Sequence, residues 1–142
     1  MQASATLRLW APVVLWAAVI FALSSVSDLG TGLGTWDLVL RKLAHAAEFA
    51  LLGALLLRAL GNARAAVALG VAYAVSDELH QHFVPGRLGS PIDVAIDSVG
   101  VGLGVVLWRS ARFSAWTRRR CPTGSSRPCS NGSTGSRTSW RD

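Results

Sequence analysis

Three ionisable side chains stand at successive three-residue steps in an otherwise apolar segment: Lys42, His45 and Glu48. On a helix this spacing keeps them within about 120° of its surface. A histidine beside a carboxylate suits general acid–base chemistry, and a lysine on the same stripe can hold an anionic group. The structural alternatives are a lysine that only snorkels at the end of a membrane span and a histidine–glutamate pair that only satisfies its own hydrogen bonds.

A second polar stretch closes another apolar segment and consists of Asp77, Glu78, His80, Gln81 and His82. Asp77 and Gln81 share a helix face at a four-residue spacing, and Glu78 and Gln81 share one at a three-residue spacing. His80 and His82 lie about 200° apart around a helix, so both cannot face one site. This stretch adds Glu78 as an acid–base candidate and Gln81 as a candidate ligand-binding residue.

A third polar stretch follows a Pro-Gly-Arg turn and contains Arg87, Asp93 and Asp97. A guanidinium offers a paired fork of donors to a phosphate or carboxylate, although Arg87 can also be a loop residue that neutralises nearby acids. Asp93 has an alternative as the closing residue of a capping box whose N-cap is Ser90. Asp97 has no such alternative and is expected to face protein. We nevertheless treat Arg87, Asp93 and Asp97 as candidate ligand-binding residues, together with Lys42.

The five carboxylates of these stretches, taken with Lys42 and Arg87, give a formal charge of −3 when the histidines are neutral. In a low-dielectric setting this concentration needs compensation by a cation, by neutralised carboxyls or by a ligand rich in hydrogen-bond donors. A metal bound by His45 and the carboxylates is one alternative. However, the sequence shows no dedicated ligand spacing, so we expect neither a metal nor another cofactor.

Four segments, at about residues 7–26, 37–60, 65–83 and 91–108, have the length and apolar character to cross a bilayer. They predict an all-α, polytopic membrane protein whose residues 1–109 form a four-helix transmembrane bundle. Gly61 and Asn62 are expected to end the second helix, and Ser90 to cap the fourth. A cleaved signal peptide at residues 9–23 is the alternative for the first segment.

Small residues in these segments predict close helix packing. The fourth segment has glycines at 100, 102 and 104, and the third has the pair Gly70 and Ala74. No predicted strand precedes these glycines, so they do not form a nucleotide-binding loop. We interpret all of them as surfaces where helices approach one another.

The net charge of +6 is unevenly distributed along the chain. From residue 109 onward there are eight arginines and one acid, whereas the first 108 residues hold six basic and seven acidic residues. Basic segments of membrane proteins lie on the cytoplasmic side. We therefore expect both termini in the cytoplasm, the three polar stretches toward the outer face of a bacterial plasma membrane, and residues 110–142 as a basic, Ser/Gly-rich disordered tail. This distribution favours membrane lipids as partners and not nucleic acid.

Residues 42–49, together with Gly53, resemble the K-x-x-H-F-x-E-Y…G stretch of VanZ-like membrane proteins. Residues 76–100 are similar to that family's E-x-x-Q-x-F-x-P-G-R-x-x-S-x-x-D…G signature, and residues 21–25 to the end of its first span. Ala46 stands where Phe is usual, Phe49 where Tyr is usual, and Asp97 where many members have Asn. The resemblance covers roughly residues 7–108. It implies a small multi-span bacterial membrane protein, and the family's namesake is linked to low-level resistance to the glycopeptide teicoplanin.

Two functions fit these observations. In the first, the protein binds or modifies a cell-envelope group, lipid-linked or peptidoglycan-related, at the outer membrane face, with His45, Glu48 and Glu78 as candidate catalytic residues. In the second, the polar cluster is non-catalytic and fixes helix packing or binds an envelope ligand. A transporter is disfavoured because the polar residues do not continue to the inner side. The sequence leaves open whether the protein is an enzyme.

Overall fold

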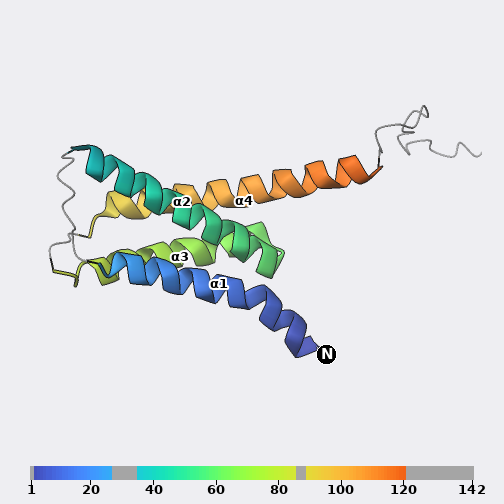
Figure 1. Ribbon diagram of the computed structural model, residues 1–142, viewed down its shortest axis with the longest axis horizontal. Helices are drawn as coiled ribbons and strands as arrows, with labels where there is room; N and C mark the ends of the chain where they lie inside the picture. Colours follow the sequence, from blue (N-terminus) through green and yellow to red (C-terminus); the bar gives the residue numbers. More distant parts are fainter. Residues whose placement is uncertain (1, 27–34, 86–88, 121–142) are drawn as a thin grey trace, which may run out of the picture. The chain divides into compact units, whose positions relative to one another are not determined.

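The computed structural model describes residues 2–26, 35–85 and 89–120, which form four α-helices. These are α1 (Gln2–Ser24), α2 (Thr35–Leu60), α3 (Ala63–Gln81) and α4 (Pro91–Arg120) (Figure 1). The prediction of an all-α protein is confirmed. The chain divides into two units, Met1–Ser110 and Ala111–Asp142, and the candidate site lies within the first.

Three helical segments are long and apolar enough to cross a membrane: Ser4–Ser24, Val39–Leu60 and Pro91–Ala115. The helix α3 is not among them, because its 19 residues include Arg64, Asp77 and Glu78. The chain is thus an all-helical membrane protein with three helices of spanning length and composition. The fourth span expected at α3 stays a prediction.

The turn between α2 and α3 is built from the two residues that the sequence indicates. Gly61 adopts a positive φ of 67°, which glycine reaches without steric cost, and its N–H donates to Leu57 O at 2.9 Å. The side chain of Asn62 then accepts hydrogen bonds from the N–H groups of Arg64 at 2.9 Å and Ala65 at 3.2 Å. The predicted stop of α2 is therefore confirmed, and Asn62 in addition starts α3, which was not predicted from the sequence.

Two helices extend beyond the expected limits. Because α1 begins at Gln2, Pro12 lies inside the helix and not in its first turn, and the ribbon of α1 bends in its N-terminal part (Figure 1). The helix α4 continues to Arg120, since no glycine or proline interrupts the chain between Gly104 and Pro122. Residues 110–120, expected to belong to a disordered tail, are therefore helical. Residues 121–142 lie outside the described residues.

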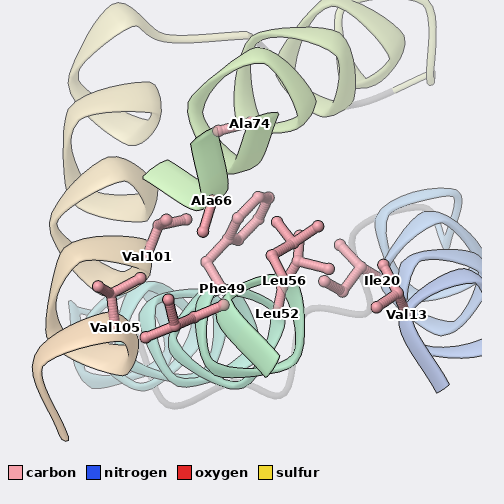
Figure 2. Close-up of a cluster of buried hydrophobic side chains, with 10 residues drawn as sticks. Val13, Ile20, Phe49, Leu52, Leu56, Ala66, Ala74, Val101 and Val105 are labelled. Carbon is pink, nitrogen blue, oxygen red and sulfur yellow. The ribbon is translucent and has the colours of Figure 1, made fainter. Parts of the chain in front are cut away.

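The apolar core gathers around α2. Phe49, Leu52 and Leu56 of this helix are almost fully buried. Figure 2 shows them between side chains of the three other helices. These partners are Val13 and Ile20 of α1, Ala66 and Ala74 of α3, and Val101 and Val105 of α4. Since α2 contributes the largest buried side chains, it sets the positions of its neighbours.

Glycines bring α4 into backbone contact with α2. A Cβ on Gly100 would collide with the carbonyl of Ala46, and one on Gly104 with the carbonyl of Ala50. Gly53 of α2 is closed off in the same way by the carbonyl of Val101. The packing role predicted for Gly102 is wrong, because nothing lies within 4 Å of the Cβ it would carry. Two glycines one turn apart therefore fix the register of α4 on α2.

Candidate functional site

The helix ends of the first unit bring the three polar stretches to one place, here called the polar end. It is where α1 and α3 end and where α2 and α4 begin (Figure 1). The buried polar residues of the described chain all lie there, and they are Ser24, Asp77, Glu78, Gln81 and Asp97. Buried charge in a membrane protein is costly and usually marks a pairing or a function. The convergence expected from the sequence is therefore present in the fold.

A hydrogen-bonded triad joins α1 to α3 at the polar end. Asp77 Oδ2 accepts from Ser24 Oγ at 2.8 Å and from Gln81 Nε2, also at 2.8 Å. The same Gln81 nitrogen lies 3.4 Å from Ser24 Oγ. The four-residue spacing of Asp77 and Gln81 on α3 makes the second contact possible, as expected. The triad is buried, with Ser24 and Asp77 0% and 2% exposed.

Glu78 holds the start of α4. Its Oε1 accepts a hydrogen bond of 2.6 Å from the N–H of Ser90, and the Ser90 hydroxyl in turn accepts from Ile92 N at 3.2 Å. Ser90 is therefore the N-cap of α4, as predicted. The predicted capping box is wrong, because the N–H that Asp93 was expected to bind is taken by Glu78 from another helix. Glu78 thus has a positioning contact in addition to its candidate catalytic role.

Lys42 of α2 forms an ion pair with Asp93 of α4. The two side chains are 45% and 31% exposed, so the pair lies at the rim of the polar end and not in its interior. The contact connects two helices that the sequence places far apart. It also engages the ammonium group that was expected to hold an anionic ligand.

His45 and Glu48 lie deeper along α2 than Lys42. The distance from His45 Nδ1 to Glu48 Oε2 is 3.9 Å, which allows an ion pair but exceeds a hydrogen bond. Their side chains are 18% and 19% exposed, although the two facing atoms themselves are buried. The indole N–H of Trp16 donates to the backbone oxygen of Glu48 at 2.9 Å, which fixes this turn of α2 against α1. The pair therefore stands on a supported stretch of helix.

Asp97 is only 2% exposed and faces protein, as expected. The carboxylates of Glu78, Asp77, Asp93 and Glu48 all interact electrostatically with it. Glu78 likewise interacts with Asp93, Asp77 and Lys42. Acidic groups from α2, α3 and α4 are thus close enough to influence one another. Their common position confirms that one cluster, and not three separate patches, forms at this end of the unit.

The two histidines that close α3 have different surroundings. His80 Nε2 lies 3.0 Å from Ser25 Oγ, and its ring stacks on Phe21 with centroids 4.2 Å apart. His82 is exposed and packs edge-on against Phe83. The prediction that both do not face one site is confirmed. Arg87, the remaining candidate, lies outside the described residues.

Ser24 and Asp77 belong to the cluster but received no site role from the sequence. Both are more deeply buried than Lys42 or His45. The available signal was the position of Ser24 at the end of the first apolar segment. No sequence pattern indicated that Ser24 would pair with Asp77, which lies 53 residues later on another helix.

The arrangement offers a partly exposed histidine–glutamate pair, a rim ion pair and a buried group of acids with hydroxyl and amide partners. Across residues 2–26, 35–85 and 89–120, no group of three or more His, Cys, Asp or Glu side chains is placed to hold a metal ion.

Comparison with known proteins gives one match. A family model described as VanZ/LLP1 matches residues 5–113, which is more than half of the chain and includes the whole polar end. No curated protein and no solved structure matches the chain.

Proposed function

The chain belongs to the VanZ/LLP1 family, and from this premise we propose that its polar end binds a group of the bacterial cell envelope. The group is lipid-linked or peptidoglycan-related and is met at the outer face of the plasma membrane. One observation carries the proposal: buried acids and polar groups from α1, α3 and α4 meet at one end of the unit, beside the partly exposed His45–Glu48 pair of α2. Ionisable groups inside a membrane bundle are energetically costly and usually mark a pairing or a function.

The membrane arrangement that we propose has four crossings with both termini in the cytoplasm. At 1.5 Å per residue, the 19 residues of α3 extend about 28 Å, which is close to the thickness of the hydrocarbon core. The charges of α3 lie near its two ends, with Arg64 at the start and Asp77 and Glu78 near the polar end. The eight arginines from residue 109 onward favour a cytoplasmic C-terminus, which puts the polar end outside.

Within this site His45 and Glu48 are the residues that we assign to acid–base work, if the bound group is modified. Both side chains are partly exposed, and their facing atoms, His45 Nδ1 and Glu48 Oε2, are buried 3.9 Å apart, close enough for one group to influence the charge of the other. Glu78 and Gln81 stabilise the arrangement of the site through their hydrogen bonds to Ser90 and Asp77, respectively. Lys42, Asp93 and Asp97 contribute charge to it, and Arg87 is a further candidate by its place in the sequence.

A non-catalytic function is the second candidate, and a specific observation favours it. Asp77 links α1 to α3 through Ser24, and Glu78 links α3 to α4 through Ser90. These bonds hold helices together without any ligand. In this reading the cluster is a polar core that binds its partner or only stabilises the bundle.

The two candidates are separated by complementing a deletion strain and measuring growth and susceptibility to teicoplanin. Glu48→Asp keeps the carboxylate, whereas Glu48→Gln and His45→Ala remove the acid–base groups. We expect the Asp variant to restore most of the phenotype, and the other two to lose it while their membrane abundance equals that of the wild type. If all three variants restore the phenotype, the acid–base role is excluded. If Gln and Ala variants vanish from the membrane, the structural role is the better account.

A further inference from the structure

We infer that the polar end takes up a protonated primary amine, and this inference rests on the proposed function. The amine is either the ethanolamine head group of a lipid or a free amine of the envelope. The inference reverses the simplest expectation from Lys42 and Arg87, which is an anionic ligand. Two independent observations support it, one of charge and one of an unsatisfied acceptor.

The charge of the polar end favours a cation. Five carboxylates stand on α2, α3 and α4, at Glu48, Asp77, Glu78, Asp93 and Asp97. Even if Arg41 and Arg87 are counted here with Lys42, the formal sum of these five carboxylates and three basic groups is −2 with neutral histidines. Lys42 pairs with Asp93 at the exposed rim and also interacts with Glu78, so it offsets only part of the negative charge. An incoming anion would meet this field unfavourably, whereas an ammonium group would relieve it.

The unsatisfied acceptor is Asp77 Oδ1. Among the residues that the structure describes, this buried oxygen has no hydrogen-bond partner, although Asp77 Oδ2 accepts two hydrogen bonds. The residue is 2% exposed and interacts electrostatically with Glu78 and Asp97, so the free oxygen belongs to the same acidic group. Buried acceptors are nearly always satisfied, and one left open in a binding cluster indicates a missing donor.

An amine fits these acceptors better than a metal ion. No group of three or more ligating side chains in the described part of the chain is placed to hold a metal. A primary ammonium carries three N–H donors and can reach oxygens that do not converge on a point. Quaternary amines carry the same charge without any N–H, which provides a direct chemical control.

The test uses the full-length protein in nanodiscs, with its thermal unfolding midpoint as the readout. Discs of phosphatidylcholine are compared with discs that contain added phosphatidylethanolamine or phosphatidylglycerol, and phosphatidylcholine discs are titrated with ethanolamine, choline, NaCl or MgCl₂. We expect phosphatidylethanolamine or free ethanolamine to raise the midpoint by about 5 °C. Asp77→Asn and Asp97→Asn should abolish this rise. Arg109→Gln, which removes a charge 18 residues after the start of α4 and so away from the polar end, should keep it.

The arms also identify the source of the amine. A rise with the lipid alone assigns a head group, and a rise with free ethanolamine assigns a soluble amine. The inference is overturned if wild-type protein shows no rise, or if choline, phosphatidylglycerol or either salt produces the same rise. The wild-type arms decide this even if an Asn variant fails to fold. If the wild-type protein shows no rise but Glu48→Gln still loses the cellular phenotype, the amine inference fails and the proposed function stands. The two failures are therefore distinguishable.

Discussion

The backbone N–H of Ser90 donates to Glu78 Oε1 at 2.6 Å, so a carboxylate of α3 satisfies the first residue of the α4 cap. Because one oxygen of the buried Glu78 side chain binds the backbone of the next helix, Glu78 has a structural role in addition to any role in binding or catalysis. This contact links the chemistry of the polar end to the entry of a membrane-spanning helix. It also separates the two oxygens of Glu78, because only Oε1 is committed to Ser90.

Glu78→Ala should destabilise the protein by about 1–3 kcal/mol, because it leaves the Ser90 N–H without its acceptor. Glu78→Gln keeps an acceptor oxygen and should cost less than half as much. Unfolding of the purified protein in detergent measures both values, with Ser76→Ala as an exposed control on the same helix. Equal losses for the Ala and Gln variants would show that charge, and not the hydrogen bond, is what α4 requires.

Ser24→Ala and Asp77→Ala should be coupled, since the hydroxyl donates to that carboxylate at 2.8 Å and each substitution removes the hydrogen bond. Hydrogen bonds between membrane helices contribute about 0.6–1.7 kcal/mol in double-mutant cycles, and we expect a coupling energy in this range. Four unfolding measurements, on the wild type, both single variants and the double variant, give the value. Strict additivity of the two substitutions would contradict the observed pairing.

The glycines of α4 provide a matched set. Gly100→Ala and Gly104→Ala place a methyl group against the carbonyls of Ala46 and Ala50, so α4 must move away from α2. Each should destabilise by about 1–3 kcal/mol. Gly102→Ala meets nothing within 4 Å and should stabilise by up to about 1 kcal/mol, because alanine is the better helix former. Thermal unfolding compares all three, and a loss at Gly102 equal to the others would refute this packing.

The ion pair of Lys42 and Asp93 should tolerate exchange of its partners. Both side chains are partly exposed, so removing either charge should cost no more than about 1 kcal/mol. Lys42→Glu should cost more than Lys42→Met because it places a like charge beside Asp93. The double variant Lys42→Glu with Asp93→Lys should recover most of that loss. Unfolding at low and at high salt provides the check, since high salt should shrink every one of these differences.

The proposed topology makes a labelling prediction. With Cys121 and Cys129 replaced by serine, a single cysteine at Pro85 should react with a membrane-impermeant thiol reagent in intact cells. A cysteine at Asn62, in the turn before α3, should react only after the membrane is opened. Both positions are exposed on the protein surface, so burial in the protein does not protect them. Reaction of Asn62→Cys in intact cells, with Pro85→Cys protected, would invert the orientation and move the polar end inside.

Much of the local structure was predictable. The apolar runs gave four helices, Gly61 and Asn62 gave the turn between α2 and α3, and Ser90 gave the cap of α4. The helix ends were less predictable, because α1 starts five residues early and α4 continues past residue 108. In both cases good helix-forming residues flank the apolar run, and hydrophobicity alone does not mark where a helix stops.

The sequence by itself determined which polar residues share a helix face and that three polar stretches stand at one end of the bundle. These properties follow from helical periodicity and from the alternation of helix direction. Only the tertiary structure decided the pairings: Lys42 with Asp93, Ser90 with Glu78, and Ser24 with Asp77. A pairing depends on how far each helix is rotated and shifted against the next. Backbone contacts such as that of Gly104 with Ala50 set that register, and they arise from packing between segments distant in the chain.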